Sequence, residues 1–376
     1  MAIDPQDNVC VTGYTRQFDY EYYQRSPFPV TENAYDQDFG QQGQHKAFVS
    51  KLNNDLTELL ASTLLGGTQT GSDSRDKDES YCIAIDANGA IYIGGQAQNR
   101  NFPTTLDCVD PIVSGDREAF VAKFDSNLEH LLASTFLGGM ENEQVTAIAL
   151  DKFGDIFAGG WTDSVDFPLK AGGYNTEYSG TAEDSFVVKL NNTMTELKAS
   201  TLLRQTANLG IGDEVISGLM LSSDEKTVFV VGRTESKSFP TTLGCFDDTF
   251  NDKKENVGAL DGRNLRDADS GDGFFSTFNS ELTELTYSTF LGGGDLDYID
   301  ALLANGDDVL VAGETFADFP LTEPYDFHKV HTRGFISRFS SDETPSNPDD
   351  NDNNDVNSRG GGGGGGCFLQ SLLGDL

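Results

Sequence analysis

Apolar and polar residues alternate in several short runs along the chain, and a period of two is typical of β-strands with one buried face. The clearest runs are AFVSKL (47–52), AFVAKF (119–124), SFVVKL (185–190), FFSTF (274–278) and GFISRF (334–339). The first four are each followed by a turn containing Asn, Ser or Asp and by a second apolar run, which predicts an antiparallel strand pair. No helical period separates these runs, so the chain is expected to be all-β.

The second apolar run is written four times in nearly the same letters. The copies are LTELLASTLLGG from Leu56, LEHLLASTFLGG from Leu128, MTELKASTLLRQ from Met194 and LTELTYSTFLGG from Leu282. A period longer than one strand or helix is the mark of a repeat architecture.

Two further apolar runs, separated by an Asp-, Asn- or Gly-containing turn, read as a hairpin that opens each unit. A variable loop with a Phe-Pro pair then leads to the alternating run; the pairs begin at Phe28, Phe102, Phe167, Phe239 and Phe319. Each unit thus predicts four antiparallel strands, with LLASTFLGG as the outer strand and the third-strand Phe filling the wedge between units. Five such units over residues 1–341 favour a β-propeller, either a closed ring or an arc of a larger one.

The repeated phrase STFLGG…AIALDxxGxxxxxG…DFP…FVxKL resembles the SBBP bacterial β-propeller repeats over nearly all of residues 1–341. The resemblance implies the propeller fold and a secreted or cell-surface protein, and it implies no catalytic residue. The family name suggests seven blades, whereas this chain has five units. Unit one lacks most of its first strand and unit five stops after Phe339 without a fourth. We therefore expect an N-terminal truncation, which would also explain why no signal peptide is visible.

One position at the end of each second strand varies between fixed neighbours, and all five would stand at equivalent places on the face that carries the long loops. The residues are Tyr14, Gln96, Trp161, Arg233 and Glu314. Two aromatic and three hydrogen-bonding side chains predict a site for a glycan, peptide or protein ligand on this face. The alternative is that they are solvent-facing strand ends without a ligand.

The charge narrows the class of partner. With Lys+Arg 25 against Asp+Glu 61 the net charge is −36, which disfavours nucleic acid and anionic lipid as partners. No apolar stretch reaches the roughly 20 residues of a membrane-spanning helix. The cysteines are too sparse to show a zinc spacing or a compartment, and their disulfide status is open: Cys10, Cys82, Cys108, Cys245 and Cys367.

Metal and catalytic signals are weak, so no cofactor and no enzyme activity are predicted. His328 and His331 lack an obvious third ligand for zinc. The Asp-rich segments 267–272 and 350–355 lack the Gly and Glu positions of an EF-hand, which leaves at most weak calcium binding. A set of acids before the first strands is interpreted as solvated, although it could line a central channel: Glu79, Glu143, Glu214 and Asp297. His45 and His130 are expected at the surface.

The tail changes composition after the repeats. Residues 342–366 are acidic, Asn-rich and then all Gly, which predicts a disordered linker. The segment 367–376 resembles part of a CFI-box C-terminal segment, although Leu369 and Gln370 depart from its pattern. We expect Cys367 to serve surface attachment or linkage between molecules.

These observations predict a non-enzymatic extracellular or cell-surface propeller for binding or scaffolding. Two alternatives remain: a polysaccharide-active hydrolase or lyase using paired carboxylates, and a self-assembling structural component of a matrix or filament.

Overall fold

The fold is an all-β propeller, seen in a computed structural model that describes residues 1–16, 27–40, 43–68, 77–178, 183–204, 213–251, 271–305, 308–316, 319, 333–340 and 368–372. The strands form five four-stranded antiparallel sheets, here called blades one to five. Their bounds are β1 (Ala2–Ile3), β2 (Val9–Arg16), β3 (His45–Leu52) and β4 (Leu59–Leu65); β5 (Glu79–Ile85), β6 (Ile91–Ala97), β7 (Glu118–Phe124) and β8 (Leu131–Leu137); β9 (Glu143–Leu150), β10 (Ile156–Thr162), β11 (Asp184–Leu190) and β12 (Leu197–Leu203); β13 (Glu214–Leu221), β14 (Thr227–Thr234), β15 (Asp272–Asn279) and β16 (Leu285–Leu291); β17 (Asp297–Asn305), β18 (Asp308–Thr315), β19 (Arg333–Ser340) and β20 (Phe368–Leu372).

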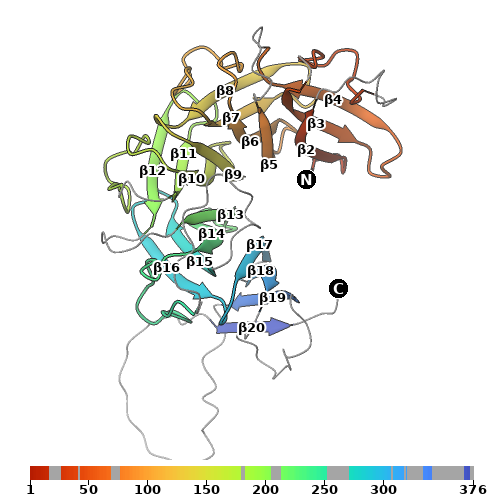
Figure 1. The fold of residues 1–376 in the computed structure, drawn as a ribbon. Helices are drawn as coiled ribbons and strands as arrows, with labels where there is room; N and C mark the ends of the chain where they lie inside the picture. Colours follow the sequence, from red (N-terminus) through yellow and green to blue (C-terminus); the bar gives the residue numbers. More distant parts are fainter. Residues whose placement is uncertain are drawn as a thin grey trace, which may run out of the picture.

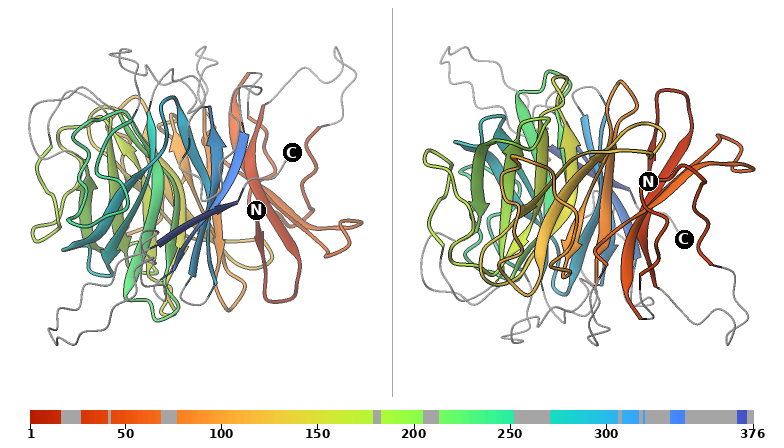
Figure 2. Two further views of the ribbon diagram at one scale, coloured as in Figure 1. Left: turned by 90° about the horizontal axis from the view of Figure 1, so that it is seen from below. Right: turned by 90° about the horizontal axis from the view of Figure 1, so that it is seen from above.

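The five blades stand side by side in an open arc (Figure 1). The inner strands β5, β9, β13 and β17 follow the concave side of the arc, and blades one and five lie on either side of its opening. Side views show the blades aligned as one layer (Figure 2). The predicted repeat, and the place of LLASTFLGG as the outer strand in β4, β8, β12 and β16, are confirmed.

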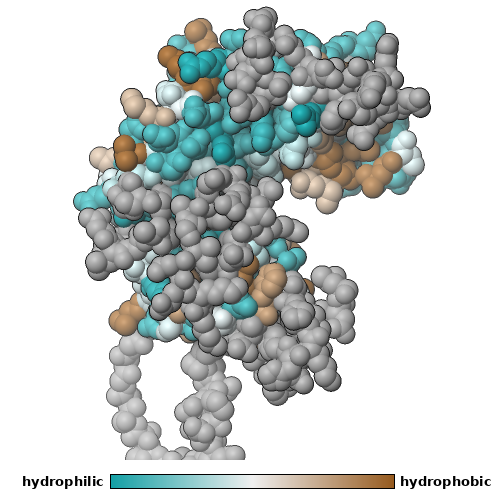
Figure 3. Space-filling view, viewed as in Figure 1, coloured by the Kyte–Doolittle hydropathy of each residue, from teal (hydrophilic) through white to brown (hydrophobic). Residues whose placement is uncertain are grey.

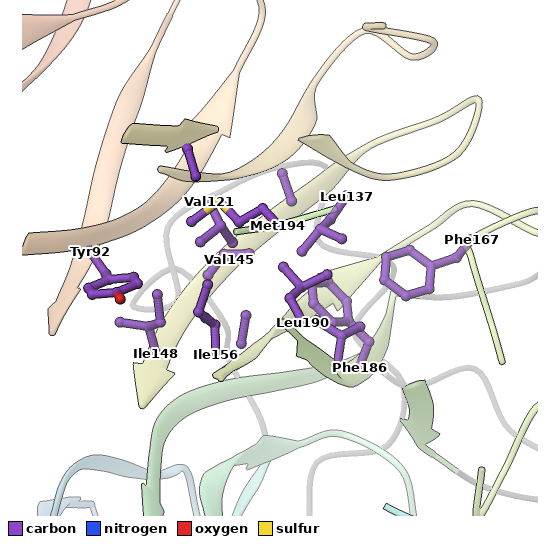
Figure 4. Packing of buried hydrophobic residues seen from close by; sticks show 14 of the residues in the cluster. Tyr92, Val121, Leu137, Val145, Ile148, Ile156, Phe167, Phe186, Leu190 and Met194 are labelled. Carbon is purple, nitrogen blue, oxygen red and sulfur yellow. The ribbon is translucent and has the colours of Figure 1, made fainter. Parts of the chain in front are cut away.

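Aromatic pairs fill the wedges between blades. The Phe of each Phe-Pro loop packs on the Phe of the third strand in its own blade, as Phe167 does on Phe186 with ring centroids 4.5 Å apart. The other four blades hold the same pair, at 4.0 to 4.6 Å between centroids. Figure 4 shows Phe167 and Phe186 beside Val145 and Ile156 at the junction of blades two and three. The third-strand Phe therefore fills the predicted wedge.

The repeated letters AST have a structural role at the outer edge. The Thr of this triplet accepts a hydrogen bond from the loop between the second and third strands, as in Asp110 N to Thr135 Oγ1 at 2.9 Å. The same bond is made to Thr63, Thr201 and Thr289. A fourth strand would otherwise present unpaired backbone groups to solvent, so this loop protects the edge.

A left-handed residue in the turn between the third and fourth strands links successive blades. Leu128, Met194 and Leu282 have φ of 56 to 60° and are fully buried. Their carbonyls accept hydrogen bonds from loop amides of the preceding blade, for example Val109 N to Met194 O at 2.9 Å. Leu56, the equivalent residue of blade one at the edge of the arc, is 61% exposed.

Blade five ends the arc on a partly uncovered apolar face. Val49, Val121, Val187 and Phe275 occupy one third-strand position and are at most 2% exposed, because the following blade covers them. Ile336 stands at this position in blade five and is 50% exposed.

The opposite face of blade one is uncovered in the same way. Val9 and Val11 are half-buried, whereas their equivalents in blade two, Ile91 and Ile93, are fully buried. Apolar side chains gather over the first blade where it borders the opening (Figure 3).

The expectation that unit five lacks a fourth strand is wrong. The strand β20 comes from the C-terminal segment and pairs antiparallel with β19, from Ile336 opposite Leu372 to Ser340 opposite Phe368. Ser371 stands opposite Ser337, the register position at which Ser288 faces Ser276 in blade four. Gln370, Ser371 and Leu372 thus take the place of the repeated triplet.

Several predicted features lie outside the described residues. These are Cys367, His328, His331 and the segments 252–270, 342–366 and 350–355. The remaining cysteines, Cys10, Cys82, Cys108 and Cys245, are free thiols. Burial raises the pKa of Cys10 to about 11 and that of Cys82 to about 12, so neither is reactive at neutral pH. The described residues contain no helix that is long and apolar enough to cross a membrane.

A proline at the tail strand tests its pairing. Gln370→Pro removes a backbone donor from β20 and should expose β19, so hydrogen exchange of β19 amides at the β20 edge should become faster, with β18 amides unchanged. Asn351→Pro, in the segment before β20, is the matched control and should leave β19 exchange as in the parent. Equal protection in all three proteins would show that β20 does not pair in solution.

Candidate functional site

The long-loop face is the face of the arc on which the second strands end and the third strands begin. The five predicted site residues all stand there, but their exposure differs. Tyr14 is 50% exposed and Glu314 is half-buried. Gln96, Trp161 and Arg233 are at most 6% exposed, so these three are not the solvent-facing strand ends of the alternative interpretation.

Tyr14 and Gln96 belong to one cluster at the junction of blades one and two. The ring of Tyr14 stacks on His45, with centroids 5.2 Å apart and planes inclined by 4°. His45 Nδ1 lies 2.5 Å from Glu79 Oε1, and Gln96 Nε2 donates to Glu79 Oε2 at 2.8 Å. Tyr81, which is 40% exposed, donates its hydroxyl to the same carboxylate. Two exposed aromatic rings therefore flank one firmly held acid.

Glu79 remains ionised in this cluster. Burial alone would raise its pKa, but the hydrogen bonds from His45 and Tyr81 and the charges of His45 and Lys77 outweigh burial and lower the pKa. The expectation that His45 is merely a surface residue is wrong, since its side chain is only 16% exposed and holds Glu79. His130, at 72%, is on the surface as expected.

Trp161 and Arg233 occupy the equivalent positions of blades three and four. They lie further along the concave edge of the long-loop face, which is called the inner rim below. The guanidinium of Arg117 lies 5.4 Å from the ring centre of Trp161. Arg233 lies 5.6 Å from the ring centre of Tyr298 and pairs with Glu235 at 3.1 Å. Arg233, Tyr298 and Glu314 line a cavity of about 70 Å³, which is too small for a sugar or peptide side chain of ordinary size.

Acids at the start of the first strands are buried, which corrects their interpretation as solvated groups. Glu143, Glu214 and Asp297 stand opposite Thr162, Thr234 and Thr315 and are at most 2% exposed. Their equivalent in blade two is Asp78 and not Glu79, because Glu79 pairs with Gln96 one step further along the strand.

A second acid group lies in the turn between β7 and β8. Asp125, Glu129 and His130 could hold a metal ion together, and they are the one such group of three among the described residues. Asp125 and Glu129 are half-buried and His130 is exposed, and exposed acidic groups are common without a metal ion.

His45, Tyr81 and Arg117 were missed as site residues. Their signal was positional. His45 and Arg117 each lie two residues before the Ala of a third-strand Ala-Phe, and Tyr81 lies two residues after Glu79, the first residue of a first strand. Aligning the residues that flank each strand, in addition to the strands themselves, would have found them.

Comparison with known proteins supplies no family. No protein-family model matches the chain, and no curated protein matches it. Solved structures with some likeness include hydrazine synthase of Kuenenia stuttgartiensis (8% identity, 84% of this chain and 66% of that chain, TM-score 0.39). Two others are the Dos1 propeller (10% identity, 71% of this chain and 60% of that chain, TM-score 0.29) and BamB from Moraxella catarrhalis (9% identity, 72% of this chain and 80% of that chain, TM-score 0.22). The chain spans less than two thirds of the length of the hydrazine synthase chain and of the Dos1 propeller. Likenesses this weak carry no argument about function.

Trp161 and Tyr14 should respond differently to truncation. Trp161→Ala removes a buried ring and should lower the free energy of unfolding by about 3–5 kcal/mol, whereas Tyr14→Ala at an exposed site should cost less than about 1 kcal/mol. Thermal unfolding followed by circular dichroism measures both. Similar losses for the two variants would contradict the assigned burial.

The buried acids make stability depend on pH. Burial raises the pKa of Glu183 to about 8, helped by the charges of Asp213 and Asp163, and burial also raises the pKa of Glu214 well above its ordinary value. The folded protein therefore binds more protons than the unfolded chain between pH 4.5 and about 8. The contribution of these two acids to stability is therefore fully present below pH 4.5 and is lost as the pH rises through their raised pKa.

We expect the melting temperature at pH 8 to lie below that at pH 5.5, and Glu214→Gln to flatten this profile by about 2 °C or more. Glu129→Gln, at a partly exposed position, is the control and should keep the parent profile. A melting temperature that rises from pH 5.5 to pH 8 would contradict the sign.

Proposed function

We propose that this protein is a non-enzymatic propeller that binds a glycan, peptide or protein ligand at the inner rim of its long-loop face. The stacked pair of Tyr14 and His45 beside the ionised Glu79 carries the proposal. An exposed, rigid aromatic platform next to a fixed hydrogen-bond acceptor suits a sugar ring or a peptide side chain. Gln96 positions the acid rather than contacting the ligand.

Two kinds of ligand are disfavoured by the charge. The net charge of −36 repels phosphate backbones and anionic lipid. A neutral glycan or a peptide with basic groups meets no such barrier, and Glu79 would accept hydrogen bonds from either.

The rival enzymatic function needs two carboxylates that converge in a pocket open to substrate. Glu118 and Glu143 do converge, but both are fully buried, and Glu79 is held by three other side chains. A binding role therefore has more support than hydrolysis or elimination on a polysaccharide.

A second candidate function is structural assembly. The half-exposed end faces at Ile336 and Val11 are the two halves of an interface that the chain forms between its own blades. Head-to-tail stacking of copies would cover both, and an open heterologous contact of this kind builds rings or filaments.

The proposal extends to the type of repeat and to the location of the protein. We infer an SBBP-type repeat protein at the cell surface or outside the cell from the repeated STFLGG and FVxKL phrases. The CFI-box likeness of the tail supports attachment or linkage through Cys367.

Binding is testable with an internal probe, because Trp161 is the sole tryptophan and lies on the inner rim. Oligosaccharides and peptides are added in steps while the fluorescence emission of Trp161 is measured. For a ligand that shifts the emission, Tyr14→Ala and Tyr81→Ala should each weaken binding by about tenfold, the effect of losing one aromatic contact.

Phe153→Ala is the matched control, since Phe153 is an aromatic residue 70% exposed in the turn on the opposite face. Binding that is insensitive to both Tyr substitutions would reject this site. Self-association in sedimentation experiments, without binding of either ligand class, would favour the structural candidate instead.

A further inference from the structure

The same three positions meet at every junction between blades, on the long-loop side. They are the first residue of a third strand or the residue next to it, the residue after the fourth strand, and the acid at the start of the next blade. The sets are Lys46, Gly66 and Asp78; Glu118, Gly138 and Glu143; Asp184, Arg204 and Glu214; Asp272, Gly292 and Asp297.

Two of these junctions carry a cation of their own. Lys46, only 1% exposed, lies beside Asp78 at the first junction and pairs with Asp36 at 2.8 Å. At the third junction Arg204 pairs with Asp184 at 3.4 Å, and its charge opposes the rise in the pKa of Glu214. The chain thus supplies positive charge where it buries these acids.

The second junction buries two acids without a cation. Glu118 and Glu143 are both fully buried, and neither takes part in an ion pair with another described residue. Glu118 Oε1 accepts hydrogen bonds from the amides of Ser114 and Gly115, at 2.6 and 2.8 Å. Glu143 Oε1 accepts one from the Thr162 hydroxyl at 2.8 Å. These bonds are all made to one oxygen, Oε1, of each carboxylate.

The other two oxygens point to the same place. Oε2 of Glu118 and Oε2 of Glu143 accept no hydrogen bond of normal geometry. A methyl group at Gly138 would overlap both atoms, so they lie within reach of one point beside the Gly138 backbone. Unpaired carboxylate oxygens that face each other in a dry site are strongly unfavourable.

Further oxygens stand close by. The Ser164 hydroxyl and the Gly139 amide lower the pKa of Glu143, and the charge of Asp166 raises the pKa of Glu118. Asp166 and Ser164 are also the nearest side chains to Gly139. The three carboxylates of Glu118, Glu143 and Asp166 and the Ser164 hydroxyl are the kind of oxygen ligands that a hard divalent cation prefers. These side chains offer no nitrogen or sulfur for a softer metal.

We propose that a divalent cation of the calcium class binds between Glu118 and Glu143 and joins blade two to blade three. The ion does at this junction what Arg204 does at the next one: it supplies positive charge between two buried acids. Gly138 leaves the space that the Arg204 side chain fills there. A cation bound by groups of both blades stabilises their contact by the free energy of its binding.

Terbium and calcium test the site in the full chain. Trp161 precedes Thr162, whose hydroxyl holds Glu143, so excitation of this sole tryptophan should sensitise emission from terbium bound at the junction. Both measurements start from protein freed of metal with EDTA, at pH 8 in potassium chloride that screens the surface charge. Calcium should displace the terbium, and calcium alone should raise the melting temperature. Terbium bound at distant surface acids receives little energy from Trp161.

Glu118→Gln with Glu143→Gln removes both charges and should weaken sensitised terbium binding by more than about tenfold. The metal-free double variant should melt no lower than the metal-free parent, because the substitution removes repulsion. Glu214→Gln changes the equivalent acid at the junction that already holds Arg204, so it should keep the terbium signal and the calcium shift of the parent.

Equal terbium signals in the parent and the double variant would overturn the proposal. So would a parent melting temperature that responds to acid but not to calcium, which would mean that a shared proton, rather than a metal ion, joins the two carboxylates. If the double variant does not fold, Glu118→Gln alone decides the matter by the same two measurements.

Discussion

The structure depends on the contact between successive blades, because a single four-stranded sheet has two apolar faces and no core of its own. Each wedge is filled by residues of both neighbours: Val121 of blade two meets Val145 and Ile148 of blade three. The buried left-handed Leu and Met residues close the same junctions from the opposite end. Stability is therefore close to a sum of neighbour contacts, and damage at one junction should loosen two blades before it reaches the others.

The same constraint explains where charge becomes buried. Strand ends converge toward the inner rim, so the acids that begin the first strands are covered by the neighbouring blade whether or not they have a partner. The repeat varies most at this point, with Lys46 or Arg204 at two junctions and a pair of acids at each of the other two. Arg204, which replaces the first Gly of Gly-Gly after β12, thus supplies positive charge where Asp184 and Glu214 meet.

The sequence predicted the parts that depend on repetition. Strand order, the outer position of LLASTFLGG and the Phe-filled wedges follow from period and spacing, which are the same in each unit. The set of buried acids was harder to predict. The first strands of blades two and three carry the same bulge, and their common register makes Asp78, rather than Glu79, the equivalent of Glu143. An alignment of the repeats can point to His45 as a position, but its contact with Glu79 could not be predicted, because the two residues meet across blades. The strand β20 was missed because the short run Phe368–Leu372 follows a long polar and Gly-rich stretch of sequence.

The origin of β20 has a mechanical consequence. Its last residue, Leu372, pairs with Ile336, and its first, Phe368, pairs with Ser340. Tension on the C-terminus would reach the pair at Leu372 first and open the ladder one bond at a time, which needs far less force than shearing all bonds together. A chain held by its tail would yield at this strand and keep blades one to four folded.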